Sequence, residues 1–256
     1  MFRNLVIASN WKAGIDDYNL ALQWLKDVNI FLKDKEDLLR GKIRIPVALP
    51  YCFLGVLNCE FFRELSLLEV FSQNVSHVGK GAYTGEVTVK MLKTLGVRGA
   101  IVGHSERRHI FGEDDELINK KISILLENDM DVIFCVGEKL EERNSGRTQE
   151  VLYNQISKGL KGVNNFDRLI VAYEPVWAIG TGVPMGIRDL QEAESFIREV
   201  FKREYKLENL CLLYGGSVNK DFIKDIRGNT GMNGVLVGSA SWTADGFIKI
   251  IENFIF

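Results

Sequence analysis

Several side chains suited to acid–base chemistry stand just after short apolar runs of this sequence. Glu174 follows one such run and precedes Pro175, which has no N–H for a sheet and therefore ends the strand there. His104 follows a second run, and Asn10 and Lys12 follow a third. A carboxylate at the end of a buried strand is a candidate general base, and an imidazole and a cation are suitable partners for negative charge on oxygen. Taken alone, Glu174 is equally consistent with a strand-end carboxylate in a salt bridge, so the other loops have to decide.

The segment after Glu174 predicts a flap. Residues 175–182 form an apolar, aromatic loop that includes Trp177 and ends in Gly180-Thr181-Gly182. Hydrophobic residues in a loop that ends in glycines are typical of a lid that closes over a bound molecule. The alternative is that Trp177 is an ordinary core residue.

Glycine-containing loops indicate a phosphate site. Gly215-Gly216-Ser217 and Gly238-Ser239 each stand between a buried strand and a helix start, where backbone N–H groups and the helix dipole favour an anion. Each loop alone is also explained as a tight turn, but with Gly180 the anion interpretation is better supported. The dinucleotide-binding spacing and the P-loop are both absent from the sequence.

The histidines and cysteines do not predict a metal site. His77, His104 and His109 lack metalloprotease spacing, and no Cys/His cluster is present. The four cysteines lack CxxC spacing and mostly stand in apolar runs, which is typical of reduced, buried thiols in a cytosolic protein: Cys52, Cys59, Cys135 and Cys211.

Charge and the N-terminal residues exclude other classes. A net charge of -2 gives no general attraction to nucleic acid or to an anionic membrane, so we expect neither as a partner. The sequence runs from Met1 straight into a strand of about six residues, which is too short for a secretion signal or a membrane span. We therefore expect a cytoplasmic protein.

Eight short apolar runs recur with starts 24 to 41 residues apart, enough for a strand, a helix and two loops. The intervening segments have helical periodicity, as at Leu190, Ala193 and Ile197, and Ser241 is a candidate N-cap of the last helix. The runs are Leu5–Ser9, Ile43–Leu49, Leu68–Ser72, Gly99–Val102, Asp131–Val136, Leu169–Tyr173, Leu210–Tyr214 and Gly234–Val237.

Alternating strands and helices predict an α/β protein with a parallel sheet covered by helices. Eight units in 256 residues fit a closed (β/α)8 barrel that forms one domain over residues 1–256. A doubly wound open sheet is the structural alternative. In a barrel the carboxyl ends of all strands share one face, so residues distant in sequence converge there.

The loops together resemble the triosephosphate isomerase family, in the family's order and over nearly the whole chain. The block of residues 172–182 around Glu174 is very specific to that family. The other matching segments are Asn10-Trp11-Lys12, Gly81-Ala82-Tyr83-Thr84-Gly85-Glu86, Gly103-His104-Ser105-Glu106-Arg107-Arg108 and Tyr214-Gly215-Gly216-Ser217.

The resemblance implies interconversion of dihydroxyacetone phosphate and D-glyceraldehyde 3-phosphate, a step of glycolysis and gluconeogenesis, without a cofactor. Glu174 matches the family's base, which moves a proton between two carbons through an enediolate. His104 matches its neutral electrophile, and Lys12 and Asn10 match residues that stabilise the oxyanion.

The resemblance also assigns the surrounding residues. Main-chain N–H groups at Gly180, Ser217, Gly238 and Ser239 match positions that hold the phosphate. Glu106 matches a carboxylate beside the active lysine. Thr84 matches an interlocking dimer contact, because the family acts as a homodimer or a larger assembly.

The sequence departs from the family's pattern at two places. Ser239 stands where a second glycine is usual after the last strand; its N–H remains available, but a serine resists a positive φ. Past the flap, Val183-Pro184-Met185 replaces the usual Lys-Thr-Ala, and a proline stiffens the chain there.

Two other functions are weighed against the isomerase. One is a Schiff-base aldolase with Lys12 as the nucleophile, which needs a lysine made reactive by an apolar pocket. The other is a barrel that binds a phosphosugar without turning it over. The presence of Lys12, His104 and Glu174 together argues against simple binding, which needs no base.

Overall fold

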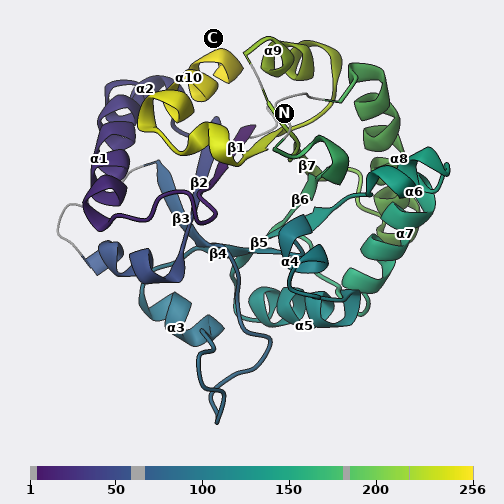
Figure 1. Ribbon diagram of the computed structural model, residues 1–256, viewed down its shortest axis with the longest axis horizontal. Helices are drawn as coiled ribbons and strands as arrows, with labels where there is room; N and C mark the ends of the chain where they lie inside the picture. The colour runs from purple at the N-terminus through teal and green to yellow at the C-terminus, as the bar shows by residue number, and fades with distance from the viewer. Residues whose placement is uncertain (1–4, 59–66, 181–184, 219, 256) are drawn as a thin grey trace.

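The strands of the protein form a closed parallel barrel (Figure 1). The computed structural model describes residues 5–58, 67–180, 185–218 and 220–255. In these ranges eight strands pair in chain order, and β1 closes the barrel by pairing with β8. Their bounds are β1 Leu5–Asn10, β2 Ile43–Leu49, β3 Leu68–Ser72, β4 Gly99–Val102, β5 Asp131–Val136, β6 Leu169–Tyr173, β7 Cys211–Tyr214 and β8 Gly234–Val237. The predicted barrel is confirmed, and the open sheet is ruled out.

Helices surround the barrel, as Figure 1 shows. No helix in the described part of the chain is both long and apolar enough to cross a bilayer. The α-helices are α1 Tyr18–Asp34, α2 Glu36–Leu39, α3 Val89–Thr94, α4 Ser105–His109, α5 Asp115–Leu126, α6 Leu140–Asn144, α7 Thr148–Gly159, α8 Ile187–Tyr205, α9 Lys220–Asn229 and α10 Ala244–Ile255. Short 3-10 helices are η1 Tyr51–Asn58, η3 Val176–Ala178 and η4 Ser239–Ser241.

Local sequence fixes where several helices begin. The Asp17 carboxylate caps α1 by accepting the N–H groups of residues 19 and 20, and the Asp114 carboxylate caps α5 by accepting the Leu117 N–H. The predicted N-cap at Ser241 is wrong. Helix α10 begins three residues later, and the Ser241 hydroxyl lies 2.7 Å from the Ser9 hydroxyl of β1.

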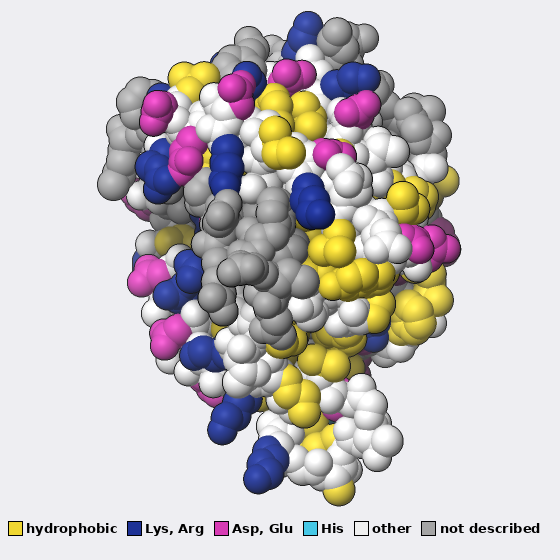
Figure 2. All heavy atoms as spheres, turned by 90° about the vertical axis from the view of Figure 1, so that its left-hand side faces the viewer, with side chains coloured by type: hydrophobic (Ala, Val, Ile, Leu, Met, Phe, Trp, Pro, Cys, Tyr) yellow, Lys and Arg dark blue, Asp and Glu magenta, His cyan; other side chains and the backbone are white. Residues whose placement is uncertain are grey.

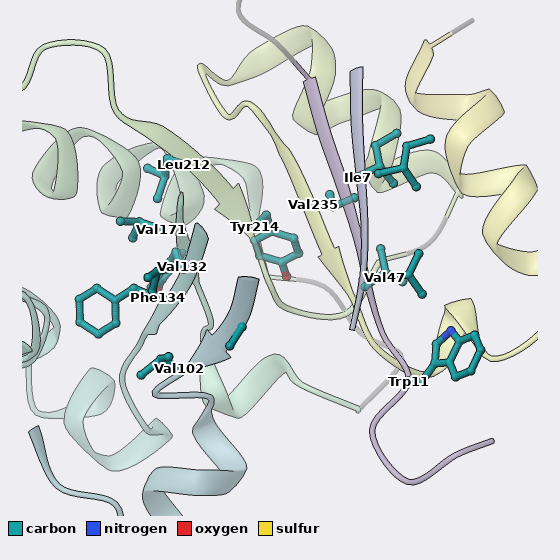
Figure 3. Close-up of a cluster of buried hydrophobic side chains, with 14 of the residues drawn as sticks. Ile7, Trp11, Val47, Val102, Val132, Phe134, Val171, Leu212, Tyr214 and Val235 are labelled. Carbon is teal, nitrogen blue, oxygen red and sulfur yellow. The ribbon is translucent and has the colours of Figure 1, made fainter. Parts of the chain in front are cut away.

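The core has two layers because successive side chains of a strand point to opposite faces. In β1, Val6 and Ala8 lie in the cluster inside the barrel, whereas Ile7 belongs to the larger cluster between strands and helices. Figure 3 shows Ile7, Val171 and Leu212 extending from their strands into this outer layer. Strands buried on both faces explain the uninterrupted apolar runs of the sequence.

The segment between β3 and α3, residues 73–88, projects from this ring. Figure 1 shows it projecting beyond the helices. Gly85, at its turn, has a φ of 92°, which a glycine adopts without strain. Thr84 lies exposed beside it.

Candidate active site

Glu174 lies buried directly after β6, with 3% of the residue exposed. Its Oε2 accepts a hydrogen bond of 2.9 Å from the Ser105 N–H, and its Oε1 lies 3.2 Å from His104 Nε2. Two glycines make room for it. A Cβ on Gly137 would lie 1.7 Å from the Glu174 carbonyl oxygen, and one on Gly215 would lie 2.8 Å from Glu174 Cγ. The carboxylate is thus held in one orientation at the carboxyl end of the barrel.

The hydrogen bonds of His104 define its tautomer. The Glu106 N–H donates to His104 Nδ1 at 3.2 Å, so this nitrogen carries no proton. The single proton of a neutral imidazole then sits on Nε2, beside the carboxylate of Glu174. His104 is therefore arranged as a neutral hydrogen-bond donor.

Lys12 is held in a backbone conformation that is uncommon for a lysine. Its φ is 50°, in the left-handed region. The Asn10 side chain accepts the Lys12 N–H at 3.0 Å, and Gln73 Nε2 donates to the Lys12 carbonyl at 2.8 Å. The ammonium lies 2.6 Å from Glu106 Oε1. A Cβ on Gly238 would lie 3.2 Å from Lys12 Cε, so the glycine leaves space for the lysine.

These residues share one cavity of about 370 Å³. It is lined by every residue predicted to act in catalysis or to bind phosphate: Asn10, Lys12, His104, Glu174, Gly180, Ser217, Gly238 and Ser239. Glu106 lies behind Lys12, and Thr84 lies on the projecting segment, away from this cavity. The structure therefore brings together loops that are up to 229 residues apart in the chain.

The phosphate end of the cavity differs in two details from the expectation. Ser239 begins η4 and is absent from the described residues with positive φ, so the serine imposes no backbone strain. The N–H of Ser217 is not free, because it donates to the Ala178 carbonyl of η3 at 3.0 Å. This bond ties the start of the flap to the loop after β7.

The described part of the predicted flap, residues 175–180, rests on Glu138. The Trp177 Nε1–H donates to Glu138 Oε1 at 3.1 Å, and the Tyr173 hydroxyl lies 3.1 Å from both carboxylate oxygens. Burial raises the pKa of the Glu138 carboxyl, and these hydrogen bonds oppose the rise. Thr181, Gly182 and the Val183-Pro184 pair lie outside the described residues.

Cys135 lies directly behind the base. The thiol is fully buried inside the barrel, and burial followed by the nearby Glu174 charge raises its pKa well above the usual value. Burial likewise raises the pKa of Cys211 to about 11. Both are thus protonated at neutral pH. The predicted burial is wrong for Cys52, a free thiol that is exposed because it lies in η1 outside the barrel strands. Cys59 lies outside the described residues.

Sequence reasoning missed three side chains that support the site. Glu138 is a strand-end carboxylate after β5, but the sequence does not indicate which groups it bonds to. Gln73 follows β3 and reaches the Lys12 carbonyl only because the barrel closes. Arg143 lies in α6 and carries no sequence signal of its own.

Comparison with known proteins identifies similar chains. A family profile described as Triosephosphate isomerase matches residues 5–254. The triosephosphate isomerase of Aquifex aeolicus is 47% identical over 255 residues, which cover 97% of this chain and 99% of that protein. Those of Finegoldia magna, over 257 residues, and Fusobacterium nucleatum, over 255 residues, are each 40% identical and cover 98% of both chains.

Proposed function

Because the chain belongs to the triosephosphate isomerase family, we propose that it interconverts dihydroxyacetone phosphate and D-glyceraldehyde 3-phosphate at the cavity described above. It is an intramolecular aldose–ketose isomerase. The observation that carries the proposal is that Glu174, His104 and Lys12 line one cavity. A carboxylate, a neutral imidazole donor and an ammonium are the groups that proton transfer beside a carbonyl requires.

In the proposed reaction Glu174 removes a proton from the carbon next to the carbonyl. The electron pair moves toward the carbonyl oxygen and gives an enediolate. The His104 Nε2–H donates to that oxygen, and Lys12 and Asn10 stabilise its negative charge, as the family's mechanism has it. Through His104, the proton of the hydroxyl on the first carbon passes to the oxygen of the former carbonyl. Glu174 then returns its proton to the former carbonyl carbon, and the new carbonyl forms at the carbon that lost its proton.

The site has to supply more than a base. A positioned base contributes on the order of 10²–10⁴-fold, and electrostatic stabilisation in a site closed to water has to supply the remainder. The apolar flap of residues 175–182 is proposed to exclude this water. Glu174 in the present structure bonds to the Ser105 N–H, so it has to leave that donor to reach substrate.

The phosphate is proposed to bind the main-chain N–H groups of Gly180, Ser217, Gly238 and Ser239. For Ser217 this requires the Ala178 carbonyl to give up the bond that it accepts now. Phosphate binding and displacement of the flap's first turn are therefore coupled in this scheme.

A second copy of this chain is the proposed partner. A further cavity of about 500 Å³ is lined by Lys12, Tyr51, His104, Glu106 and Phe111. Phe111 is 65% exposed, and Figure 2 shows hydrophobic side chains gathered next to the projecting segment. We propose a homodimer in which Thr84 of that segment reaches the partner's cavity beside Lys12.

The proposal also covers the extent of the domain, its location and its need for a cofactor. The whole chain, residues 1–256, acts as one catalytic domain in the cytoplasm and takes part in glycolysis and gluconeogenesis. No cofactor is required, because Glu174 and His104 carry out the proton transfers.

A coupled assay of the purified chain tests the proposal. We expect turnover of both triose phosphates and competitive inhibition by phosphoglycolate. Borohydride trapping with substrate is the companion measurement, and we expect no adduct. The Lys12 ammonium is paired with Glu106 at 2.6 Å, whereas a Schiff-base nucleophile has to be uncharged. A covalent adduct at Lys12, or absence of isomerase turnover, would refute the proposal.

A further inference from the structure

Arg143 of α6 meets three elements around the base at once. Its guanidinium lies 4.8 Å above the Trp177 ring, Nη1 lies 3.6 Å from Glu138 Oε1, and Nη2 lies 2.8 Å from Asp189 Oδ2. Asp189 is in the first turn of α8, and Figure 1 shows α6 beside this helix. The arginine therefore joins η3, the loop after β5 and the start of α8.

Glu138 connects this arginine to the base. The carboxylate is bonded to Tyr173, the residue before Glu174, and to Trp177, three residues after it. The Glu138 carbonyl also accepts the Val176 N–H at 3.0 Å. Glu138 thus fixes the chain on both sides of Glu174.

This arrangement depends on a positive charge at Arg143. Glu138 has no exposed surface, and a buried carboxylate needs hydrogen bonds and an opposite charge to remain ionised. Arg143 is 75% buried at the same place and also covers the aromatic ring of Trp177. Asp189 forms an ion pair with Nη2, the other terminal nitrogen of the guanidinium, and so helps to orient its plane.

We infer that Arg143, oriented by Asp189, is a positioning residue for the base: it holds Glu138 and Trp177 in place, and through them residues 173–177 and the carboxylate of Glu174. The inference rests on the proposed isomerase function. We expect a larger effect on kcat than on substrate affinity. Two of the four proposed phosphate ligands, Gly238 and Ser239, belong to the loop after β8 and bond to none of these groups, although Ser217 bonds to η3.

The variants R143M and D189N test the inference. R143M keeps an unbranched apolar stem but removes the guanidinium and its charge. We expect kcat to fall at least tenfold with KM within threefold, since a misplacement near 1 Å costs on the order of 10²-fold. D189N should lower kcat about threefold. R143K should be intermediate, because an ammonium retains the charge but cannot stack on Trp177 and bond Asp189 together.

The matched control is R188M. Arg188 is the neighbour of Asp189 in α8, but its side chain is 88% exposed and pairs with Glu192 at the surface, so kcat should equal that of the wild type. A double-mutant cycle separates a specific Arg143–Asp189 coupling in kcat from a general loss of protein stability. If Asp189 acts only through Arg143, R143M/D189N should have the kcat of R143M within twofold.

Wild-type turnover is measured first, and its absence would refute the proposed function itself. With an active wild type, an R143M enzyme whose kcat stays within twofold overturns the role of Arg143. A D189N effect of equal size in both backgrounds also overturns it. If R143M does not fold, D189N and R143K decide, and wild-type kcat in both rejects the inference.

Discussion

Replacing Glu174 by aspartate is the sharpest perturbation of the proposed base. The change keeps the charge and retracts the carboxylate by one methylene, about 1 Å. The 2.9 Å bond to the Ser105 N–H and the 3.2 Å contact with His104 would both lengthen to about 4 Å, beyond hydrogen-bonding range. A base displaced by this distance from the reacting carbon should lose on the order of 10²-fold in kcat.

The coupled assay in both directions measures this loss, and the exposed Glu192, changed to aspartate, provides the control. The variant should fold, because a single buried methylene is worth about 1 kcal/mol of unfolding free energy. Thermal unfolding checks that point. An E174D enzyme with kcat within twofold of the wild type would refute Glu174 as the base.

Four further predictions address other parts of the account. K12A should lose most of its activity and keep an unfolding free energy within about 1 kcal/mol of the wild type, because the ion pair that it breaks is partly exposed. Turnover measures the activity and calorimetry the stability, and an unfolded K12A protein would mean that Lys12 has a structural role. G96A should lower the unfolding free energy by about 1 kcal/mol, because Gly96 has a φ of 82°. G228A, within α9, should raise the unfolding free energy by about 0.5 kcal/mol. Urea unfolding compares the two variants, and a change of the same sign in both would contradict this reasoning. T84R should shift the sedimentation of the dimer toward the monomer, and unchanged sedimentation would remove Thr84 from the interface. S239A should change the KM for D-glyceraldehyde 3-phosphate less than threefold, since the main-chain N–H is the proposed ligand; a larger rise would assign binding to the hydroxyl.

The barrel was predictable because its strands are buried on both faces. Residues such as Ile7 face the helices and Val6 faces the barrel interior, so both positions have to be apolar and the strands stand out as continuous runs. The bounds of β2 to β6 and β8 match the prediction. Only β1 and β7 differ, by one residue each.

The site was predictable where its catalytic side chains stand directly after the carboxyl ends of strands. Once the barrel is closed, Glu174 and Lys12 have to lie on one rim, and they do. Local motifs could not predict the hydrogen-bond partner of a side chain that has several possible partners. The Ser241 hydroxyl could cap a helix or cross to Ser9, and only the packing of β1 against η4 decides between them.

The supporting network was beyond sequence reasoning for the same reason. Arg143 is one of many surface-type arginines in a charged helical stretch, and its partners lie 5 to 46 residues away along the chain. Nothing in its neighbours indicates that it packs on Trp177. Contacts of this kind depend on the angle between two loops, which periodicity does not encode.

Transfer of deuterium from solvent tests the central claim most directly. When the chain converts dihydroxyacetone phosphate in D2O, a proton taken up by Glu174 exchanges with solvent, so D-glyceraldehyde 3-phosphate should carry deuterium at C2 by NMR, and E174A should produce almost none. Wild-type product free of deuterium, or labelling that persists at the wild-type rate in E174A, would contradict proton transfer by this carboxylate.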